Sequence, residues 1–423
     1  MKKKLSETTF QSFIIKLSKV VLIAVLAIIY LQAQNWAWKK HMLVDGYFAF
    51  YDRASYFLEY HNLTNIPFNE YQPGAIFYFV SLSPALLLEN TRDFYLLALL
   101  LSNVLLILIY AKAVRKSRGP WAVLGLSTLL LAVGPLILFR FEMYVHWWVI
   151  LGLWAWQRKQ PFLALLFIGI ATSIKVYPVL LIPYFLLLIF KQPQHRLVNM
   201  TKVLAGFATG LTLVIVAYMT LFQTSFSDIT KNVLVHEEKP VHIESISGTL
   251  VTAWHLVTTQ SAPQTNSYLI HGLSEKSLGL PTIVYHYLWL LPVGLYYLWL
   301  LWKLPSQALL RLEHVIGLYM LFLLSVSQLG PQYFLWFALF VPFLPHLQKG
   351  PPEKLIWLYL QLSLLFFLTQ LEYPLFYDAI LDFFYRNGTW TPVLILFARN
   401  VVFAGVVLSF FRQFVLPATT AAA

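Results

Sequence analysis

The 423-residue chain contains no cysteine, and only 11% of its residues are Asp, Glu, Lys or Arg. The missing cysteines exclude a disulfide scaffold, a zinc knuckle, an iron–sulfur cluster and a thiol nucleophile. The charged fraction is less than half of the typical quarter, while 59% of the residues are hydrophobic. The chain is too apolar for a soluble globular fold, so the composition predicts an all-α polytopic membrane protein.

Three common catalytic fingerprints are also missing: a phosphate-binding loop, a dinucleotide-binding glycine motif and a Gly-x-Ser-x-Gly elbow. Nucleotide hydrolysis, hydride transfer and serine hydrolysis are therefore not the first hypotheses. The formal charge of +12 does not indicate a nucleic-acid partner. The basic residues are not gathered into a basic domain with interleaved aromatic residues.

Apolar runs predict about twelve transmembrane helices, since a helix needs roughly 20 residues to cross about 30 Å of hydrocarbon. They lie near 17–34, 94–111, 120–138, 143–157, 161–174, 176–190, 203–221, 282–302, 314–330, 332–346, 355–371 and 392–411. A further apolar stretch, 73–88, is interrupted by Pro84 and bracketed by Glu70 and Glu89. We interpret it as a helix in the membrane interface rather than a span.

The charges predict the orientation. With both termini cytoplasmic and 73–88 left out of the spans, 19 of the 30 Lys and Arg lie inside. Of the 18 Asp and Glu, only Glu7, Glu313 and Glu353 lie inside. We therefore expect a multi-pass protein of the plasma (inner) membrane with an extracytoplasmic active site.

The chain is predicted to form a single integral membrane domain, residues 1–423. Residues 35–93 form a first outer loop with juxtamembrane helices, and 222–281 form a second large outer loop. The first span is expected to stay as an anchor, because no small-residue cleavage site follows it. Gly206 and Gly210 form a small-xxx-small motif, which fits close helix packing inside the bundle or a dimer face.

The first outer loop carries Asp45, Asp52 and Glu59 at intervals of seven residues. On a helix of 3.6 residues per turn this spacing returns each carboxylate to nearly the same face. The stripe fits the solvated face of a surface helix. It also fits a general base held near the bilayer, which would deprotonate a hydroxyl nucleophile.

Ionisable residues also occur at the outer ends of predicted spans: Arg140 and Glu142 on one, and Lys175 with Tyr177 between two short ones. Charges at membrane depth are costly and indicate function by default. Two cations and one acid suit a lipid phosphate or pyrophosphate. Snorkelling of Arg140 and Lys175 to phospholipid headgroups is the alternative.

The second outer loop contains a titratable cluster that runs from His236 to Ser245 and includes Lys239, His242 and Glu244. His and Glu are metal ligands, but no His-Glu-x-x-His motif occurs. We therefore expect no cofactor and no metal site, and a divalent metal stays an alternative.

Five segments, in chain order, resemble the GT-C glycosyltransferases that use polyprenyl-phosphate sugars. The resemblance is closest to glycosyltransferase family 87 and extends to the GPI mannosyltransferase I group. The segments are Asp45 to Pro73, which includes Glu70 and Tyr71; Arg140-Phe141-Glu142; Ile174-Lys175-Val176-Tyr177-Pro178; Val241-His242-Ile243-Glu244-Ser245; and Gly330-Pro331-Gln332-Tyr333-Phe334-Leu335-Trp336.

The resemblance implies a GT-C-type bundle that moves a hexose, mannose or a related sugar, from a polyprenyl-phosphate carrier. The acceptor would be a hydroxyl on a lipid-linked or envelope glycan, and the anomeric centre would be inverted. The implied base is Asp45 or Asp52. The implied substrate-binding residues are Glu70, Tyr71, Arg140, Glu142, Lys175, Tyr177, His236, Lys239, Glu244, Gln332, Tyr333 and Trp336.

The sequence departs from the family pattern in three places. The leading Asp-x-Asp-Tyr is reduced to Asp45-Gly46-Tyr47, Glu142 replaces an Asp, and Lys239-Pro240 stands in place of Arg-Gly. These departures argue against metal dependence and leave the choice between Asp45 and Asp52 open.

The competing class is a polyprenyl-lipid flippase or transporter, which would use the same cations to hold a lipid phosphate. A transporter is expected to carry ionisable groups near the bilayer midplane and to have related halves. The predicted spans are almost free of charge at their midplanes, and no related halves are evident. A structural membrane subunit is the third class, and the acids of the first loop argue against it.

Overall fold

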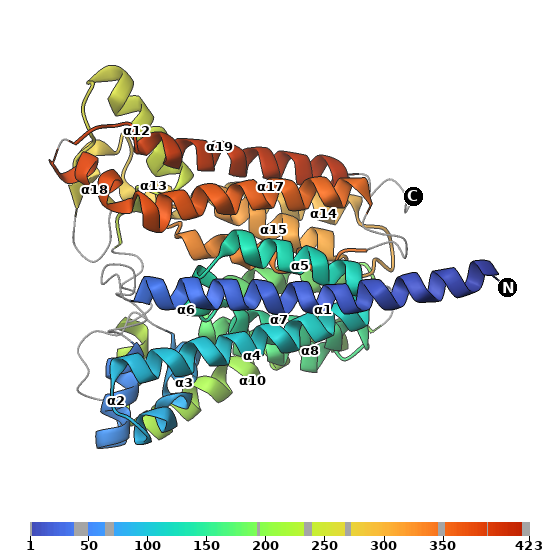
Figure 1. Cartoon of the computed structure of the whole chain (residues 1–423). Coiled ribbons are helices and arrows are strands. Elements are labelled where there is room, and N and C mark those ends of the chain that lie inside the picture. Colours follow the sequence, from blue (N-terminus) through green and yellow to red (C-terminus); the bar gives the residue numbers. More distant parts are fainter. Residues whose placement is uncertain are drawn as a thin grey trace.

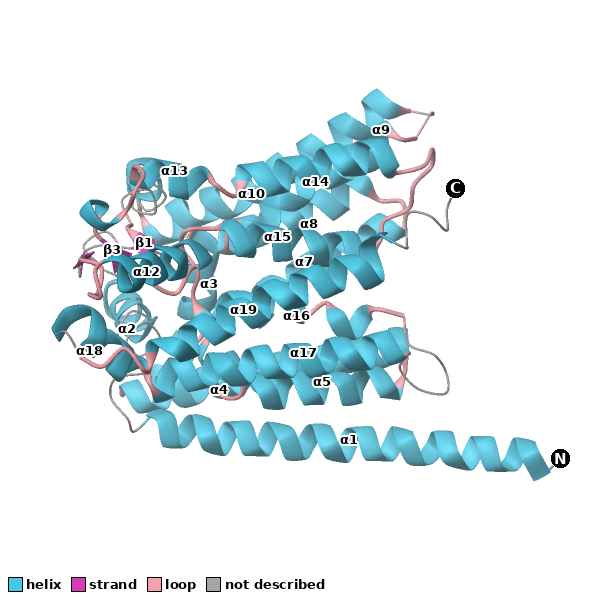
Figure 2. Cartoon of the chain, turned by 90° about the horizontal axis from the view of Figure 1, so that it is seen from above, coloured by secondary structure: helices cyan, strands magenta, loops and turns pink. Residues whose placement is uncertain are grey.

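The protein is a bundle of roughly parallel and antiparallel helices, with shorter helices and a small sheet gathered at one end (Figures 1 and 2). The computed structural model describes residues 2–37, 50–63, 72–192, 195–231, 239–266, 272–345, 352–386 and 388–416. Helix α1 (Lys2–Ala37) starts at the end of the bundle that lies opposite to the short helices and the sheet. Helix α19 (Val393–Phe410) ends there too.

Among the described residues, six helical segments are long and apolar enough to cross a membrane, as in a multi-pass membrane protein. They confirm the predicted spans near 17–34, 94–111, 203–221, 282–302, 355–371 and 392–411. They are Phe10–Asn35 within α1; α4 (Arg92–Arg118); α10 (Arg196–Phe222); α13 (Thr282–Tyr287) with α14 (Leu290–Lys303); α17 (Glu353–Gln370) with the π-helix η7 (Leu371–Leu375); and α19 with the π-helix η8 (Phe411–Val415).

Shorter helices occupy the other six predicted spans, so the count of twelve stays a prediction. They are α5 (Pro120–Val133), α6 (Leu136–Phe139), α7 (Glu142–Gln157), α8 (Pro161–Ile174), η3 (Tyr177–Leu180), α9 (Leu181–Phe190), α15 (Leu312–Ser325), η5 (Pro331–Phe334), α16 (Leu335–Ala338) and η6 (Val341–Phe343).

Three spans that were predicted as continuous helices are shorter or broken into pieces in the structure. The helix predicted over 120–138 breaks at Gly134, whose φ of 62° is a left-handed conformation that favours glycine. The span predicted over 314–330 ends at Ser325, and Val326 is extended ahead of Gly330-Pro331. The span predicted over 332–346 is three short helical pieces.

The end of the bundle away from the start of α1 carries the non-spanning elements (Figure 1). They are α2 (Tyr51–Tyr60), α3 (Pro73–Ser81), η2 (Ser83–Leu87), α12 (Ile246–Thr258), η4 (Glu275–Ser277), α18 (Tyr377–Arg386), β1 (Val241–His242), β2 (Thr265–Asn266) and β3 (Gly272–Leu273). The strands form an antiparallel sheet in the order β1-β3-β2, in which Leu273 pairs with both Val241 and Thr265. At nine residues, α3 is only about 13 Å long, too short to cross hydrocarbon alone.

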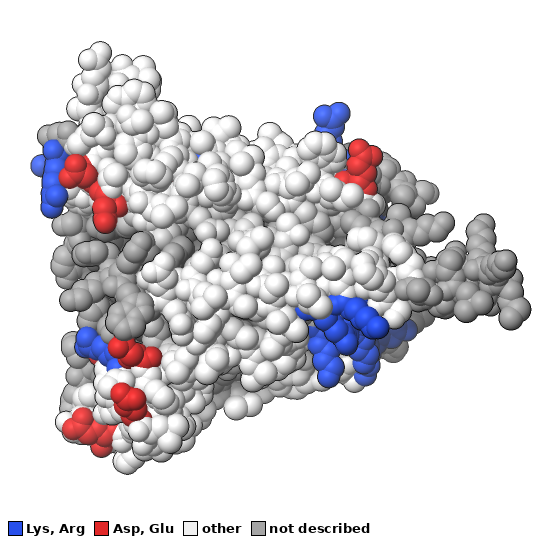
Figure 3. All heavy atoms as spheres, viewed as in Figure 1, with Lys and Arg blue, Asp and Glu red and all other residues white. Residues whose placement is uncertain are grey.

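The two ends differ in charge. On the face shown in Figure 3, a dense group of Lys and Arg lies towards the end where α1 starts, and acidic residues lie mainly at the opposite end. A large apolar core fills the bundle, and a smaller cluster that includes Ile243, Phe383 and Val393 fills the acidic end. The segment 239–245, which carries the predicted site residues Lys239 and Glu244 and includes β1, lies at this acidic end.

Candidate active site

A buried ion pair forms where α7 begins and α8 ends. Glu142 is the first residue of α7, and Lys175 follows the last residue of α8. Lys175 Nζ contacts Glu142 Oε1, and the Glu142 side chain is 0% exposed while that of Lys175 is 18% exposed. Burial of this acid depends on its partner, because a buried charge without compensation is strongly destabilising. The partly exposed Lys175 side chain is the more accessible member of the pair.

Aromatic rings surround the Lys175 ammonium. Its Nζ lies 4.8 Å from the ring centroid of Phe141, 5.2 Å from that of Tyr333 and 5.3 Å from that of Trp336. Trp336 stacks on Tyr177 at 4.1 Å and on Tyr333 at 4.4 Å. The faces of aromatic rings stabilise a cation and also offer flat apolar surfaces. The segments 140–142, 175–178 and 331–336 therefore converge on one charged group.

Four buried polar atoms on these segments have no hydrogen-bond partner among the residues that the structure describes. They are Glu142 Oε2, Tyr177 Oη, Gln332 Oε1 and Trp336 Nε1. The carboxylate and amide oxygens accept, the indole nitrogen donates, and the phenol does both. Buried polar atoms in folded proteins are nearly always paired, so this set indicates a site for a polar ligand.

Glu244 is a second buried carboxylate at this end, 7% exposed. Burial raises the pKa of Glu244 to about 7, although Arg399, a hydrogen bond donated by Tyr377 and Arg140 all act to lower it. Arg140 therefore acts on Glu244, while Glu142, two residues further on, pairs with Lys175. The Arg140-Phe141-Glu142 segment links the two acidic groups.

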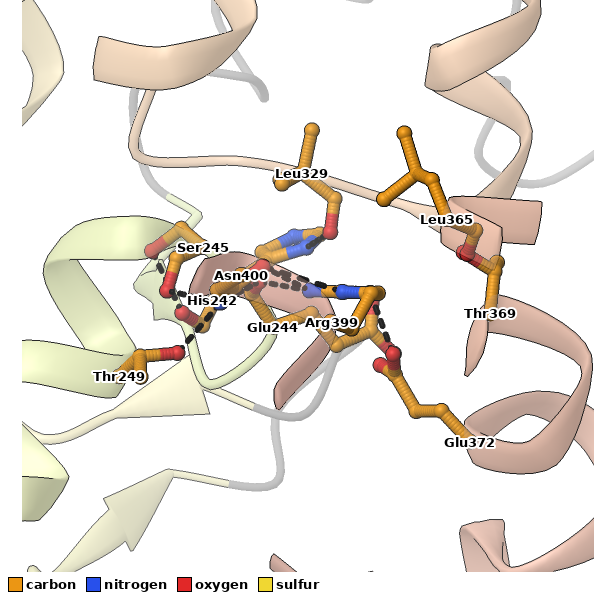
Figure 4. A network of polar contacts seen from close by, with 10 residues as sticks. All are labelled: His242, Glu244, Ser245, Thr249, Leu329, Leu365, Thr369, Glu372, Arg399 and Asn400. Carbon is orange, nitrogen blue, oxygen red and sulfur yellow. Dashed lines mark hydrogen bonds and ion pairs between the residues drawn. The ribbon is translucent and has the colours of Figure 1, made fainter. Parts of the chain in front are cut away.

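A polar network, drawn in Figure 4, holds the main chain of Glu244 to α19. Arg399 Nη1 lies 2.6 Å from Glu372 Oε2, and both side chains are fully buried. The Arg399 guanidinium also donates to the carbonyl oxygen of Glu244 and, at 2.9 Å, to Asn400 Oδ1. Asn400 Nδ2 donates to the Glu244 carbonyl oxygen at 3.1 Å and to Thr249 Oγ1 at 2.5 Å.

The other side of the Glu244 loop is attached to the segment before the aromatic cluster. The His242 amide donates to the carbonyl oxygen of Ser327 at 2.9 Å, and His242 Nδ1 lies 3.4 Å from that of Leu329. Lys239, 8% exposed, stands at the start of the same loop. The loop is thus fixed between α19 and the 331–336 segment.

The family model of glycosyltransferase family 87 matches residues 69–326, more than half of the chain. The chain belongs to glycosyltransferase family 87. A search of curated proteins finds no match. This family 87 enzyme is therefore a transferase, and the matched region contains the Lys175–Glu142 pair and Glu244.

The structure brings many of the predicted site residues of this family 87 enzyme together. Glu142, Lys175, Tyr177, Tyr333 and Trp336 form one cluster. Arg140 precedes this cluster in the chain and acts on Glu244, Gln332 lies on the same segment as Tyr333, and Lys239 leads into the Glu244 loop. Their roles in transfer stay predictions.

Asp52 lies elsewhere on the surface. Its side chain is 53% exposed and pairs with Arg92 at 3.3 Å. Glu59, one heptad later on α2, is also exposed, so these two acids lie on a solvated face. Four predicted site residues lie outside the described residues: Asp45, Glu70, Tyr71 and His236.

Four residues of the network around Glu244 were not identified from the sequence: Arg399, Asn400, Glu372 and Tyr377. The expectation that the midplanes of the spans are almost free of charge stays a prediction, since Arg399 lies in the first third of the segment Val393–Val415 and Glu372 near the end of the segment Glu353–Leu375. Arg399 is six residues inside α19 and was visible as an ionisable residue within the apolar run 392–411. Its partners lie far apart in the sequence, so only the fold identifies them.

No group of three or more His, Asp or Glu that could hold a metal occurs among the described residues. His236, Glu237 and Glu238 lie outside them. The expectation of a metal-independent enzyme therefore stays a prediction.

Proposed function

We propose that the enzyme transfers a hexose, mannose or a related sugar, from a polyprenyl-phosphate carrier to a hydroxyl group. The acceptor is a lipid-linked or envelope glycan, and the anomeric centre is inverted. The reaction takes place on the extracytoplasmic side of the plasma membrane. The partners of the enzyme are thus a lipid-phosphate sugar donor, a glycan acceptor and the surrounding lipids.

The Lys175 cluster is the observation that carries the proposal. A lipid-phosphate sugar combines an anion, several hydroxyl groups and a flat apolar sugar face. The cluster offers a lysine whose side chain is partly exposed, buried polar atoms without partners among the described residues, and stacked aromatic rings. Charge-assisted contacts suit the phosphate, and ring faces suit the sugar.

Inverting transfer needs one base and a stabilised leaving group. A carboxylate takes the proton of the acceptor hydroxyl as the oxygen bonds to the anomeric carbon. The bond between that carbon and the phosphate oxygen breaks, and the polyprenyl phosphate leaves as an anion that Lys175 and Arg140 stabilise. Lys239 and His236 are further candidates for this cationic environment, and Glu70, Tyr71, Tyr177, Gln332, Tyr333 and Trp336 are candidates for contacts with the sugars.

Asp45 is our first candidate for the base. Phe50, which is fully buried, stacks on Phe79 at 3.6 Å and meets Phe141 at 6.2 Å, so α2 starts beside the 140–142 segment. Phe50 is five positions after Asp45, a chain length of at most about 18 Å. Asp52 is the second candidate, but its pairing with Arg92 suits an orienting role better.

The fold we propose is the GT-C type, with about twelve transmembrane helices and juxtamembrane helices in the first outer loop. The six long spans and the shorter apolar helices support it. The basic residues near the start of α1 support cytoplasmic termini under the positive-inside rule. Family membership identifies a transferase. No observation on the described residues favours a flippase over a transferase.

The decisive experiment is a transfer assay on the purified protein, with radiolabelled polyprenyl-phosphate hexoses and extracted envelope lipids. We expect a covalent product, its loss in Asp45→Asn with donor binding retained, and a smaller loss in Asp52→Asn. A tenth or more of the turnover in Asp45→Asn would move the base to Asp52, Glu70 or Glu244. Transfer from a nucleotide sugar but from no lipid-linked hexose would contradict the proposal, and movement of label without a covalent product would indicate a flippase.

A further inference from the structure

Helix α12 has an apolar outer face, although its fully buried residues are small or polar: Ser247, Gly248 and Thr252. Val251 and Leu256 are partly buried against the apolar cluster of the acidic end. The most exposed large residues of α12 are Leu250, Trp254 and Val257, at 65%, 67% and 80%. The latter three are four and three residues apart, so they form one stripe along the helix. A surface helix in water would instead place polar or charged residues on its exposed face.

The inward face of α12 is firmly attached. Ser245 caps the helix by accepting a hydrogen bond from the Gly248 amide at 2.9 Å. A Cβ on Gly248 would lie 2.1 Å from the carbonyl oxygen of His242, so the helix rests directly on the Glu244 loop. Thr249 is bonded to Asn400, and His255 Nε2 lies 3.1 Å from the carbonyl oxygen of Ser277. The exposed stripe is therefore held in place rather than free to turn inward.

Two observations identify what covers the stripe. The helix, Ile246–Thr258, contains no Asp, Glu, Lys or Arg. The contact between His255 and Ser277 also attaches it to the segment that leads into the Thr282–Lys303 span, whose first turns expose the apolar residues Ile283 and Tyr287. An uncharged stripe with a tryptophan, on a helix attached next to the start of a candidate span, fits the membrane interface.

We infer that α12 is an interfacial helix whose stripe of Leu250, Trp254 and Val257 lies in the lipid leaflet at the acidic end of the bundle. Because Glu244 directly precedes the cap of α12, this contact fixes the depth of the Glu244 loop relative to the bilayer surface. The inference does not depend on the sugar donor.

The absence of native cysteine allows a direct test. We would label Leu250→Cys, Val257→Cys and the exposed control Ser261→Cys with an environment-sensitive fluorophore, in nanodiscs that contain only phosphatidylcholine and phosphatidylglycerol. Nitroxide lipids should quench the labels at 250 and 257, and aqueous iodide should not. The label at 261 should respond in the opposite way.

Equal iodide quenching at all three positions would overturn the inference. Protection at 250 and 257 that occurs only in native membranes, and not in nanodiscs, would also overturn it by indicating a protein partner. Because an apolar label favours lipid by itself, a second test uses unlabelled Leu250→Glu/Val257→Glu with Ser261→Glu as control. Only the double variant should lose protection of the 246–258 backbone against hydrogen exchange in nanodiscs, and an unchanged exchange pattern would contradict membrane contact.

Discussion

Two ion pairs are buried in the part of the chain that the structure describes. Lys175 pairs with Glu142, and Arg399 pairs with Glu372. Compensation makes the burial of four ionisable groups tolerable in an apolar bundle, because removal of one partner leaves an isolated buried charge. Of these four side chains, only that of Lys175 has an appreciable exposed fraction. Lys175 is therefore able to contact a ligand, whereas the fully buried Arg399–Glu372 pair stabilises the fold.

Glu244 predicts a pH dependence of stability. Burial raises its pKa from 4.5 to about 7, so between these values the folded protein holds a proton that the unfolded chain releases. The free energy of unfolding should therefore fall as pH rises through that window. Glu244→Gln should remove this part of the decline, and the exposed control Glu59→Gln should keep it. Denaturation of purified protein across the window measures the slope, and identical slopes in all three proteins would contradict the assignment.

Individual site residues were predictable where a charge interrupts an apolar run. Lys175, Glu142 and Arg140 stand at the ends of predicted spans, and the structure brings their segments together. The network around Arg399 was not predictable, since Asn400 and Glu244 are 156 positions apart and meet only through packing. Residue type indicated which groups are candidates for the site, and tertiary contacts decided their partners.

At the scale of elements, helix starts followed from local chemistry. Pro73, Pro120 and Pro161 stand at the first turns of α3, α5 and α8, a position where proline costs no hydrogen bond. Helix ends were less predictable. The extended residues after Ser325 read as apolar and helical in the sequence, but their backbone pairs with His242 instead.

The packing of α8 against α10 explains the Gly206 and Gly210 motif. A Cβ on Gly210 would lie 2.1 Å from the carbonyl oxygen of Leu166, and one on Gly206 would lie 2.2 Å from that of Phe162. Both contacts are with backbone, which cannot move aside as a flexible side chain can. The motif therefore serves close packing inside the bundle, one of the two interpretations that the sequence allowed.

We expect alanine at two helical glycines to act in opposite directions. Gly210→Ala should destabilise the protein by about 1 to 3 kcal/mol through overpacking. Gly294→Ala in α14, where a Cβ would meet nothing within 4 Å, should stabilise it by up to about 1 kcal/mol through helix propensity. Thermal unfolding of both variants provides the measurement, and a stabilised Gly210→Ala would contradict the close α8–α10 contact.

For the whole molecule, the separation of basic and acidic ends predicts the orientation in the membrane. Lys116 lies in the last turn of α4, and Ser261 lies at the acidic end. An impermeant thiol reagent on intact cells should label Ser261→Cys and leave Lys116→Cys unlabelled until the cells are permeabilised. Labelling of Lys116→Cys in intact cells would reverse the orientation and place the site in the cytoplasm.

The central claim is that the Lys175 cluster binds the phosphate of a lipid-linked sugar donor. Donor binding to purified protein tests it most directly, with the radiolabelled polyprenyl-phosphate hexose as ligand. The informative variant is Lys175→Met/Glu142→Gln, because it removes the cation without leaving a buried carboxylate unpaired. The control is Lys191→Met, which changes a partly exposed lysine at the C-terminal end of α9.

We predict that the double variant loses about 2 to 5 kcal/mol of binding free energy, roughly a 30-fold to several-thousand-fold rise in Kd, while Lys191→Met binds as the native protein does. A folded double variant whose Kd stays within about twofold of the native value, less than 0.5 kcal/mol, would contradict the account.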